Sequence, residues 1–309
     1  MTQNTPEGGP RAAPAPAPEI EFRDVHTRWE AYGGKPAIEG IRAEALAGFS
    51  FTLPAGKSTV LLGDRKSGKT LVALHLLLEV PLESGQLLSN GESVWDMPEE
   101  KRMMLHDQVG TMIGDSHIRR SHINRGVTVR ENLLAQLRRS TKVTEPEADI
   151  EEWLHDYDLA GIADKLPDKT SSSARRRLAM ALALAWDPAL VVLDDLGAAI
   201  DYAHFKPLND AAVKWHQRTG ATVLITVRSL AMAKLVSHQV AILRDGKVLE
   251  CGPPDEVLRG VSDDESFERR FHTKLGGFSE YDPDRLASHG TDPRHVSRIG
   301  LMDLGRMRR

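Results

Sequence analysis

Cysteine, long apolar runs and excess charge are all scarce in this sequence of 309 residues. The single cysteine, Cys251, excludes a disulfide within the chain and fits a reducing compartment such as the cytosol. The longest apolar runs, 71–80 and 178–186, are far shorter than the roughly 18 to 20 residues that a membrane-spanning helix needs. The N-terminus has neither the basic region nor the apolar stretch of a signal peptide. We therefore expect a protein that reaches a membrane only through partners.

The charge balance is close to neutral, with a formal net charge of −4. It gives no sign of a generally basic surface for nucleic acid, and basic residues do not alternate with aromatic residues. The twelve histidines show no spacing typical of a metal site with histidine and cysteine ligands. We therefore expect no nucleic-acid partner and no metal centre of that kind.

Composition divides the chain into three parts. Residues 1–19 are rich in proline, alanine and glycine, and we expect a disordered lead-in. Residues 20–257 carry recurrent strand and helix patterns and form the predicted domain. These patterns weaken over 258–309, a C-terminal extension with an arginine-rich end. Strand signals stop over 116–185, where helical stretches predict a helical insertion in an α/β domain.

Buried strands and one hairpin are predicted within that domain. Alternating or continuous apolar residues predict strands over 20–25, 49–53, 58–62, 190–193 and 221–227. Helices are predicted over 70–80 and 204–219, the second ended by Gly220. The Asp-Gly pair at 245–246 predicts the turn of a β-hairpin over 239–250.

The segment Gly63–Thr70, GDRKSGKT, matches the phosphate-binding pattern G-x-x-x-x-G-K-[ST] at every fixed position. Its glycines let backbone N–H groups wrap a phosphate, and the following helix adds the positive end of its dipole. A glycine-rich turn without function is the alternative, and the strand before and the helix after argue against it. The predicted nucleotide-binding residues of this loop are Gly63, Asp64, Arg65, Lys66, Ser67, Gly68, Lys69 and Thr70.

Lys69, Thr70 and Asp194 are the predicted phosphate and metal ligands. A lysine at the position of Lys69 reaches the β- and γ-phosphates, and the Thr70 hydroxyl ligates Mg²⁺. Four apolar strand residues, 190–193, deliver Asp194 to the edge of the sheet, where a carboxylate can hold the Mg²⁺ shell. The alternative for Asp194 is a residue that only caps a strand. The sequence therefore predicts Mg²⁺ and ATP as ligands.

The order of these motifs resembles the ATP-binding subunits of ABC transporters. The resemblance covers 20–257 and rests on the phosphate loop, the helical insertion, the serine-rich segment 170–174 and DPALVVLDD at 187–195. It implies an α/β fold, with a P-loop NTPase core, a mostly parallel sheet, an N-terminal antiparallel β subdomain and the helical insertion. It also implies that Trp29 stacks on the adenine base.

In that family each nucleotide lies between the phosphate loop of one subunit and the signature segment of another. The resemblance therefore implies that Ser171, Ser172 and Ser173 contact the nucleotide of a second ATP-binding subunit, in a homodimer or a heterodimer. It further implies membrane-spanning transporter subunits as partners, and a cytoplasmic protein held by them at the inner face of the cell membrane. Serine-rich signatures occur in polysaccharide-exporting members, which favours that type.

The chain departs from the family pattern at four sites that serve catalysis. Asp195 stands where the family has the glutamate that polarises the attacking water, and a displacement of about 1 Å can cost about 100-fold in rate. Val227 replaces a histidine that contacts the γ-phosphate, and Gly114 replaces a glutamine. Ser172 and Ser173 replace the two signature glycines, so that Cβ atoms stand where backbone approaches a phosphate.

Two functions remain from these motifs. The first is a weakly hydrolytic ATP-binding subunit of an ABC transporter, in which Asp195 is a poor general base and slow hydrolysis needs a partner. The second is a non-hydrolytic regulatory or scaffold module that holds ATP as a structural ligand. A transport-independent ATPase acting on DNA or ribosomes is disfavoured, because such relatives carry two domains of this kind or a long coiled coil.

Overall fold

The computed structural model describes residues 16–28, 44–63, 66–113, 123–140, 143–196, 202–228 and 238–259. Four positions singled out in the sequence lie outside the described residues: Trp29, Asp64, Arg65 and Gly114. The same holds for 1–15 of the predicted lead-in and for 260–309 of the predicted extension.

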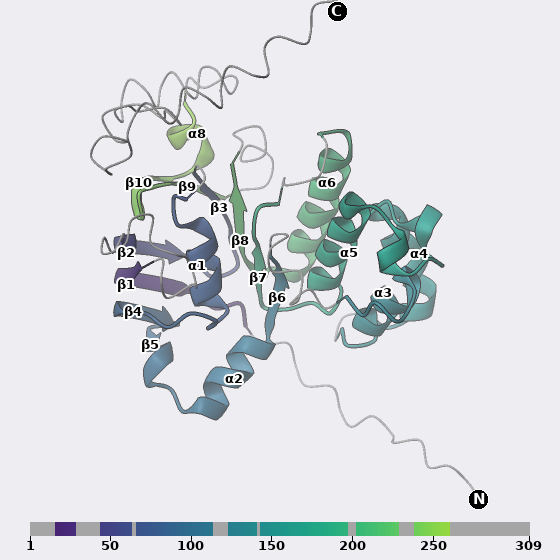
Figure 1. Cartoon of the computed structure of the whole chain (residues 1–309), viewed down its shortest axis with the longest axis horizontal. Coiled ribbons are helices and arrows are strands. Elements are labelled where there is room, and N and C mark those ends of the chain that lie inside the picture. The colour runs from purple at the N-terminus through teal and green to yellow at the C-terminus, as the bar shows by residue number, and fades with distance from the viewer. Residues whose placement is uncertain are drawn as a thin grey trace, which may run out of the picture.

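The helices and strands follow one another along the chain as Figure 1 shows. The strands are β1 (Ile20–Arg28), β2 (Glu44–Leu53), β3 (Ser58–Leu62), β4 (Ser84–Ser89), β5 (Glu92–Ser93), β6 (Val109–Met112), β7 (Leu190–Leu193), β8 (Thr222–Val227), β9 (Gln239–Arg244) and β10 (Lys247–Gly252). The helices are α1 (Lys69–Leu76), α2 (Glu99–Asp107), α3 (Val129–Leu137), α4 (Pro146–Asp156), α5 (Ser172–Leu184), α6 (Tyr202–Thr219) and α8 (Pro254–Val257).

A six-stranded sheet lies at the centre of the domain, in the order β10-β9-β3-β8-β7-β6. β9, β3, β8, β7 and β6 are parallel, and β10 pairs with β9 in the antiparallel sense. Because β3 lies between β8 and β9, the segment after Leu62 leaves from the middle of the carboxyl edge. The predicted α/β fold with a mostly parallel sheet is confirmed.

Both faces of the parallel strands are covered, as the continuous apolar runs predict. Successive strand residues alternate between the faces. Val60 and Leu62 of β3 belong to a core shared with helices α3 to α6, whereas Leu61 belongs to a second core shared with α1 and the antiparallel sheet. This arrangement fixes the register of β3 and so the position of the loop that follows it.

The second sheet is antiparallel, in the order β2-β1-β4-β5. Its apolar face buries Phe22 and Phe49, whose rings meet edge to face with centroids 5.2 Å apart. This face packs into the same core as α1. The N-terminal antiparallel part implied by the family resemblance is therefore present.

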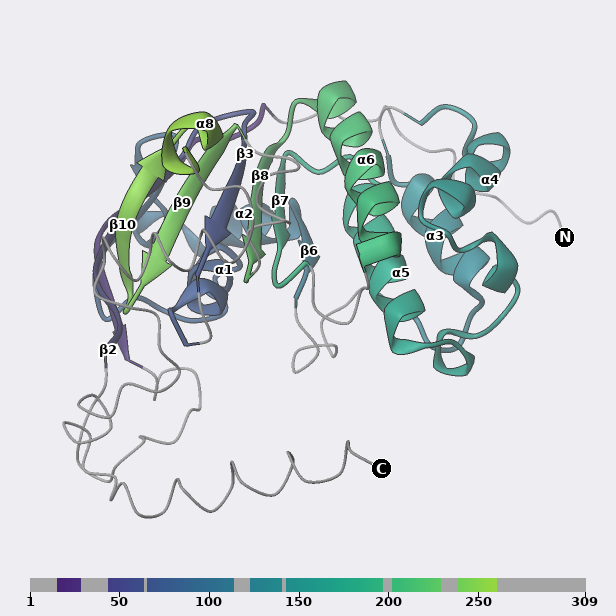
Figure 2. The ribbon, with the colours of Figure 1, turned by 90° about the horizontal axis from the view of Figure 1, so that it is seen from above.

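Helices α3 and α4 lie beyond α5 and α6, on the side away from the parallel sheet (Figure 2). A capping box starts α3, with the Thr128 side chain accepting from Glu131 N and the Glu131 carboxylate accepting from Thr128 N. α5 packs closely on β6, since a Cβ on Gly110 would lie 2.2 Å from the carbonyl oxygen of Ala183. The described part of the predicted insertion over 116–185 thus contains α3, α4 and α5 and no strand.

The prediction of the hairpin is correct, whereas the prediction of the first helix is wrong at its C-terminal end. The hairpin is confirmed, with Asp245 and Gly246 both at positive φ between β9 and β10. The helix predicted over 70–80 is too long, because α1 ends at Leu76 and Leu78 takes a φ of 54°. The chain then turns back, so that Val80 O lies 2.8 Å from Nδ1 of His75.

The described end of the lead-in, 16–19, lies against the domain. Thr222 Oγ1 donates a hydrogen bond of 2.6 Å to Pro18 O, and Glu19 N donates one of 2.9 Å to Asn90 Oδ1. Among the described residues, no helix combines the length and the apolar character that crossing a bilayer demands.

Candidate functional site

The loop between β3 and α1 is shaped by two of its glycines. Gly68 has a φ of 106°, which side chains rarely allow, and a Cβ there would lie 2.8 Å from Ala45 O. A Cβ on Gly63 would lie 2.3 Å from Leu243 O and 2.8 Å from Ser67 Oγ. The loop therefore needs glycine at both positions to close on itself and to start α1 at Lys69.

Lys69 lies inside this loop and is only 7% exposed. Its ammonium group donates to Gly63 O at 2.6 Å and to Ser67 Oγ at 3.1 Å. A buried ammonium is costly to desolvate unless hydrogen bonds or opposite charge compensate it. The loop thus holds a positive charge at its centre, next to the first turn of α1.

Asp194 follows β7 directly and is 2% exposed. Thr70 Oγ1 donates to Asp194 Oδ2 at 3.1 Å, and Thr226 Oγ1 donates to Oδ1 at 2.6 Å. The backbone N–H of Asp194 donates to Met112 O at 2.7 Å. The ends of β6, β7 and β8 and the first turn of α1 therefore meet at Asp194, whose carboxylate contacts Thr70 and Thr226.

Mg²⁺ fits this group of atoms, because it prefers oxygen ligands, usually one or two carboxylates together with substrate phosphates. The Thr70 hydroxyl and the Asp194 carboxylate are such oxygens and already lie within hydrogen-bond distance of each other. The structure brings the two predicted metal ligands together from positions 124 residues apart.

Asp195 is held through both its backbone and its side chain. Its φ is 54°, and its N–H donates to Thr226 Oγ1 at 2.8 Å. Nη2 of Arg176, on α5, donates to Asp195 O at 2.5 Å and to Asp194 O at 3.3 Å. The Asp195 carboxylate forms an ion pair with Arg228, which follows β8.

A cavity of about 240 Å³ connects these residues. Its lining consists of Lys66, Ser67, Gly68, Lys69, Thr70, Leu71, Asp194, Asp195, Thr226 and Arg228. Three cationic side chains face two carboxylates around it, and N–H groups of a helix start lie at its wall. Such a concave site at the carboxyl edge of a parallel sheet suits an anionic ligand such as a polyphosphate.

Sequence reasoning missed Thr226, Arg228 and Arg176. Thr226 and Arg228 lie at the carboxyl end of β8, next to the carboxyl end of β7 and Asp194. The strand order would have pointed to them as site residues. Arg176 comes from the helical part, and the sequence carries no local signal that points it to the backbone of Asp194 and Asp195.

The signature serines lie elsewhere in the structure, since none of them lines the cavity. Ser171 caps α5 by accepting from Ala174 N at 3.1 Å, and Ser172 is exposed. Ser173 Oγ accepts from Arg177 Nη1 at 3.0 Å. Within one chain, these residues and the phosphate loop are therefore not parts of the same cavity.

Val227 is 1% exposed and belongs to the same apolar core as Leu62 and Leu193. Its carbonyl oxygen accepts from Gly63 N at 3.3 Å, which ties β8 to the phosphate loop. The side chain is part of the core and not of the cavity lining. Arg228, one residue further on, takes the place at the cavity wall.

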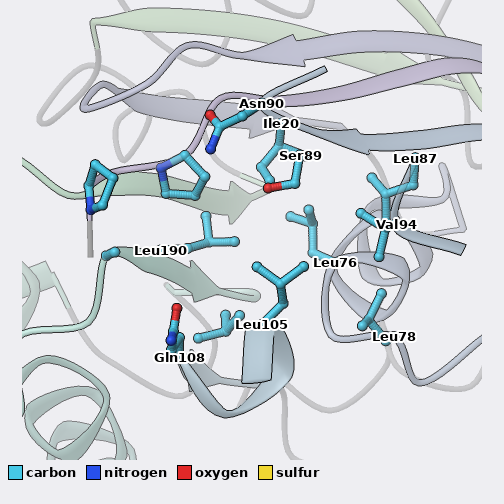
Figure 3. Close-up of a pocket in the computed structure, with 14 residues that line it drawn as sticks. Ile20, Leu76, Leu78, Leu87, Ser89, Asn90, Val94, Leu105, Gln108 and Leu190 are labelled. Atoms are coloured by element: carbon cyan, nitrogen blue, oxygen red, sulfur yellow. The ribbon is translucent and has the colours of Figure 1, made fainter. Parts of the chain in front are cut away.

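A second cavity, of about 180 Å³, lies at the opposite ends of β6 and β7 (Figure 3). Leu190 begins β7 and Leu76 ends α1, whereas Asp194 and Lys69 lie at the other ends of these elements. Figure 3 shows Leu76, Leu105 and Leu190 around an apolar space. Its lining holds no ionisable side chain, so we do not assign it to the phosphate chemistry.

Together, the glycine loop, the central lysine and the Thr70–Asp194 pair define a P-loop nucleotide-binding domain. Residues 46–197 match the family model described as ABC transporter. Over these residues the chain is therefore similar to the ATP-binding domains of the ABC transporter family.

Curated relatives and solved structures agree with this assignment. The chain is 28% identical over 262 residues to the methionine import ATP-binding protein MetN of Caulobacter vibrioides, covering 84% of this chain and 73% of MetN. It is 29% identical to the spermidine/putrescine import ATP-binding protein PotA of Aggregatibacter actinomycetemcomitans, covering 78% of this chain and 59% of PotA.

Among solved structures, CbiO1 of Clostridium perfringens, part of the ABC transporter complex CbiONQ, aligns with a TM-score of 0.61 at 18% identity. That alignment covers 83% of this chain and 95% of CbiO1. The dimeric, post-hydrolysis ATP-binding cassette MJ0796 aligns with a TM-score of 0.62 at 17% identity, over 76% of this chain and 98% of MJ0796. At these identities the structures support the fold.

Proposed function

We propose that this chain is the ATP-binding subunit of an ABC transporter, which binds Mg-ATP at the phosphate loop and hydrolyses it slowly or only with a partner. The observation that carries the proposal is the network of Lys69, Thr70 and Asp194 around one cavity. These are the side chains that phosphate binding and metal binding require, and the fold holds them together.

In this proposal the residues divide the work of binding. Lys69 and the N–H groups of 66–70 bind the β- and γ-phosphates, and Thr70 and Asp194 hold Mg²⁺. Bound Mg²⁺ would neutralise charge that develops on the phosphates. Thr226 orients Asp194 by its hydrogen bond to Oδ1.

In the proposed function, this chain binds ATP well but hydrolyses it slowly. Asp195 is the candidate general base, and its carboxylate is paired with Arg228 and carries one methylene fewer than the family's glutamate. Val227 is buried in the core and offers no polar group to a phosphate. We propose that Asp195 orients water poorly and that turnover is therefore slow.

Membrane-spanning subunits and a second ATP-binding subunit are the proposed partners, with Ser171, Ser172 and Ser173 facing the nucleotide of the second subunit. The exposure of Ser171 and Ser172 and the absence of all three serines from the chain's own cavity lining support that role. The polysaccharide-export assignment rests on the serine run alone, whereas the relatives above are named as import proteins. The proposal therefore stops at the subunit and names no cargo.

One observation favours the second candidate, a non-hydrolytic ATP-binding regulatory or scaffold module. Without nucleotide, the ion pair with Arg228 occupies the carboxylate that the reaction would need as a base, and the module requires that this pair persists when ATP binds. In such a module ATP would stabilise a conformation and would not be turned over.

The two candidates are separated by Asp195→Asn, measured as steady-state ATP turnover with Lys69→Ala as the blank. If Asp195 is a general base, Asp195→Asn lowers turnover to the blank while Mg-ATP still binds. Turnover of Asp195→Asn equal to that of the unaltered chain would remove Asp195 from catalysis and favour the regulatory module.

A further inference from the structure

The ion pair between Arg228 and Asp195 bridges two walls of the phosphate cavity. Asp195 stands after β7, and Arg228 stands after β8, the neighbouring strand. Both side chains line the same cavity as Lys69 and Thr70. The Arg228 side chain is 43% exposed, whereas that of Asp195 is 18% exposed. Of the two paired side chains, that of Arg228 is thus the more accessible to solvent.

A phosphate in this cavity would compete with Asp195 for Arg228. Guanidinium binds carboxylate and phosphate by the same planar pattern of N–H donors, and both acceptors are negatively charged. The cavity that holds the Asp195 carboxylate also holds the cations of Lys66 and Lys69, which attract a polyphosphate. The terminal phosphate carries more negative charge than one carboxylate, so it is the stronger attraction for an arginine within reach.

Resting on the proposed function, we propose that Arg228 is the residue that distinguishes ATP from ADP in this chain. Without nucleotide it pairs with Asp195, and with ATP it binds the γ-phosphate and releases the Asp195 carboxylate. Arg228 would then supply the γ-phosphate contact that the buried Val227 does not.

Hydrogen bonds hold the end of β8, directly before Arg228, in place. The Thr226 hydroxyl donates to Asp194 Oδ1 and accepts from Asp195 N, and the backbone oxygens of Thr226 and Val227 accept from Leu196 N and Gly63 N. The residue after this anchored strand end therefore has a defined position relative to the phosphate loop. A change in what Arg228 binds is transmitted directly to Asp195, since the two side chains are in contact.

The test compares the affinities of the full chain for Mg-ADP and for the β,γ-imido analogue of ATP, which is not hydrolysed, by titration calorimetry. Arg228→Gln is expected to weaken binding of the ATP analogue about tenfold, because a charge-assisted hydrogen bond is lost, and to change binding of ADP by less than about twofold. Arg23→Gln is the matched control, because it breaks a comparable exposed ion pair with Glu21 on β1.

A double-mutant cycle with Asp195→Asn separates competition for Arg228 from simple repulsion. If Asp195 competes with the γ-phosphate, Asp195→Asn tightens binding of the ATP analogue in the unaltered chain but not in Arg228→Gln. If Asp195 only repels the phosphate, the gain persists or grows in Arg228→Gln, and the proposal is wrong.

Two further outcomes separate a failure of this inference from a failure of the proposed function. Equal weakening of both nucleotides in Arg228→Gln would overturn the role of Arg228 and leave the proposed function intact. Absence of any Mg-nucleotide binding by the unaltered chain would overturn the proposed function and this inference with it. Thermal unfolding of each variant in the absence of nucleotide shows that the fold is kept.

Discussion

The phosphate loop with Asp194 and the start of α5 are two parts of the same proposed machinery, and they are built in opposite ways. Lys69 and Asp194 are 7% and 2% exposed and are tied by hydrogen bonds to three strand ends and a helix start. Ser171 and Ser172 are exposed, and Ser171 bonds only within its own helix turn among the contacts described. The first part is completed within one chain, whereas the second is open to a partner.

This difference indicates at which positions the fold tolerates an amino-acid substitution. A change at Gly63 or Gly68 meets backbone oxygens at less than 3 Å, so glycine is required there by the fold itself. At Ser172 the exposed helix start accepts a side chain without a clash in this chain. The fold thus requires glycine at two positions of the phosphate loop but does not require it at the start of α5.

The largest expected effect comes from Lys69→Ala. Removal of the buried ammonium takes away charge-assisted hydrogen bonds to two phosphates, and we expect Mg-ATP affinity to fall about 100-fold or more. Titration calorimetry measures it, with Lys101→Ala, in an exposed pair with Glu92, as the control. Unchanged affinity would place the nucleotide outside the loop.

The next effect is that of Asp194→Asn on the role of the metal. The amide keeps an oxygen for the hydroxyl of Thr70 or Thr226 but loses the charge that holds Mg²⁺. We expect affinity for ATP in Mg²⁺ to fall at least about tenfold, with little change in excess chelator. Titrations with and without Mg²⁺ measure the difference, and an equal loss in both would argue that Asp194 is only structural.

Gly68→Ala and Ser172→Gly test the comparison directly. Gly68→Ala places a Cβ 2.8 Å from Ala45 O at a φ of 106°, and we expect it to cost about 2 to 4 kcal/mol of unfolding free energy. Ser172→Gly changes an exposed position at the start of α5, and we expect a cost of about 1 kcal/mol or less. Urea unfolding compares them; similar costs would break the contrast between the two regions.

The smallest expected effect is a pH dependence from His75, behind the loop in α1. Burial lowers the pKa of His75, while its Nδ1–H bond to Val80 O opposes this. The folded state thus binds a proton less readily than the unfolded state, so stability is fully present above the unfolded pKa of about 6.5 and falls as the pH drops below it. Urea unfolding between pH 7 and pH 5 should show a shallower decline in His75→Gln, and an unchanged decline would exclude His75 as the cause.

Much of the fold followed from local signals. The Gly63–Thr70 segment, the apolar strand before Asp194 and the Asp-Gly turn at 245–246 each carry their information within a few residues. The predicted end of α1 was wrong. The apolar run continues to Val80, but the backbone turns back after Leu76 and brings Val80 O within hydrogen-bond distance of His75 Nδ1.

The rest of the site depends on contacts across the chain. Arg176, Thr226 and Arg228 reach Asp194 and Asp195 from other elements, and the pairing of Arg228 with Asp195 follows only from the neighbouring positions of β7 and β8. No periodicity or spacing encodes such a pairing. The roles assigned to Trp29 and Gly114 stay predictions, since both residues lie outside the described part of the chain.

The most direct test of the account is to measure Mg-ATP binding and ATP turnover side by side on the same preparation of the full chain, with Lys69→Ala as the blank. The account predicts clear binding that Lys69→Ala weakens about 100-fold or more, together with turnover above that blank but well below about 1 per second. Turnover of about 1 per second or faster, in the ordinary range of enzymes, would contradict the claim that the binding residues are intact while Asp195 is a poor base.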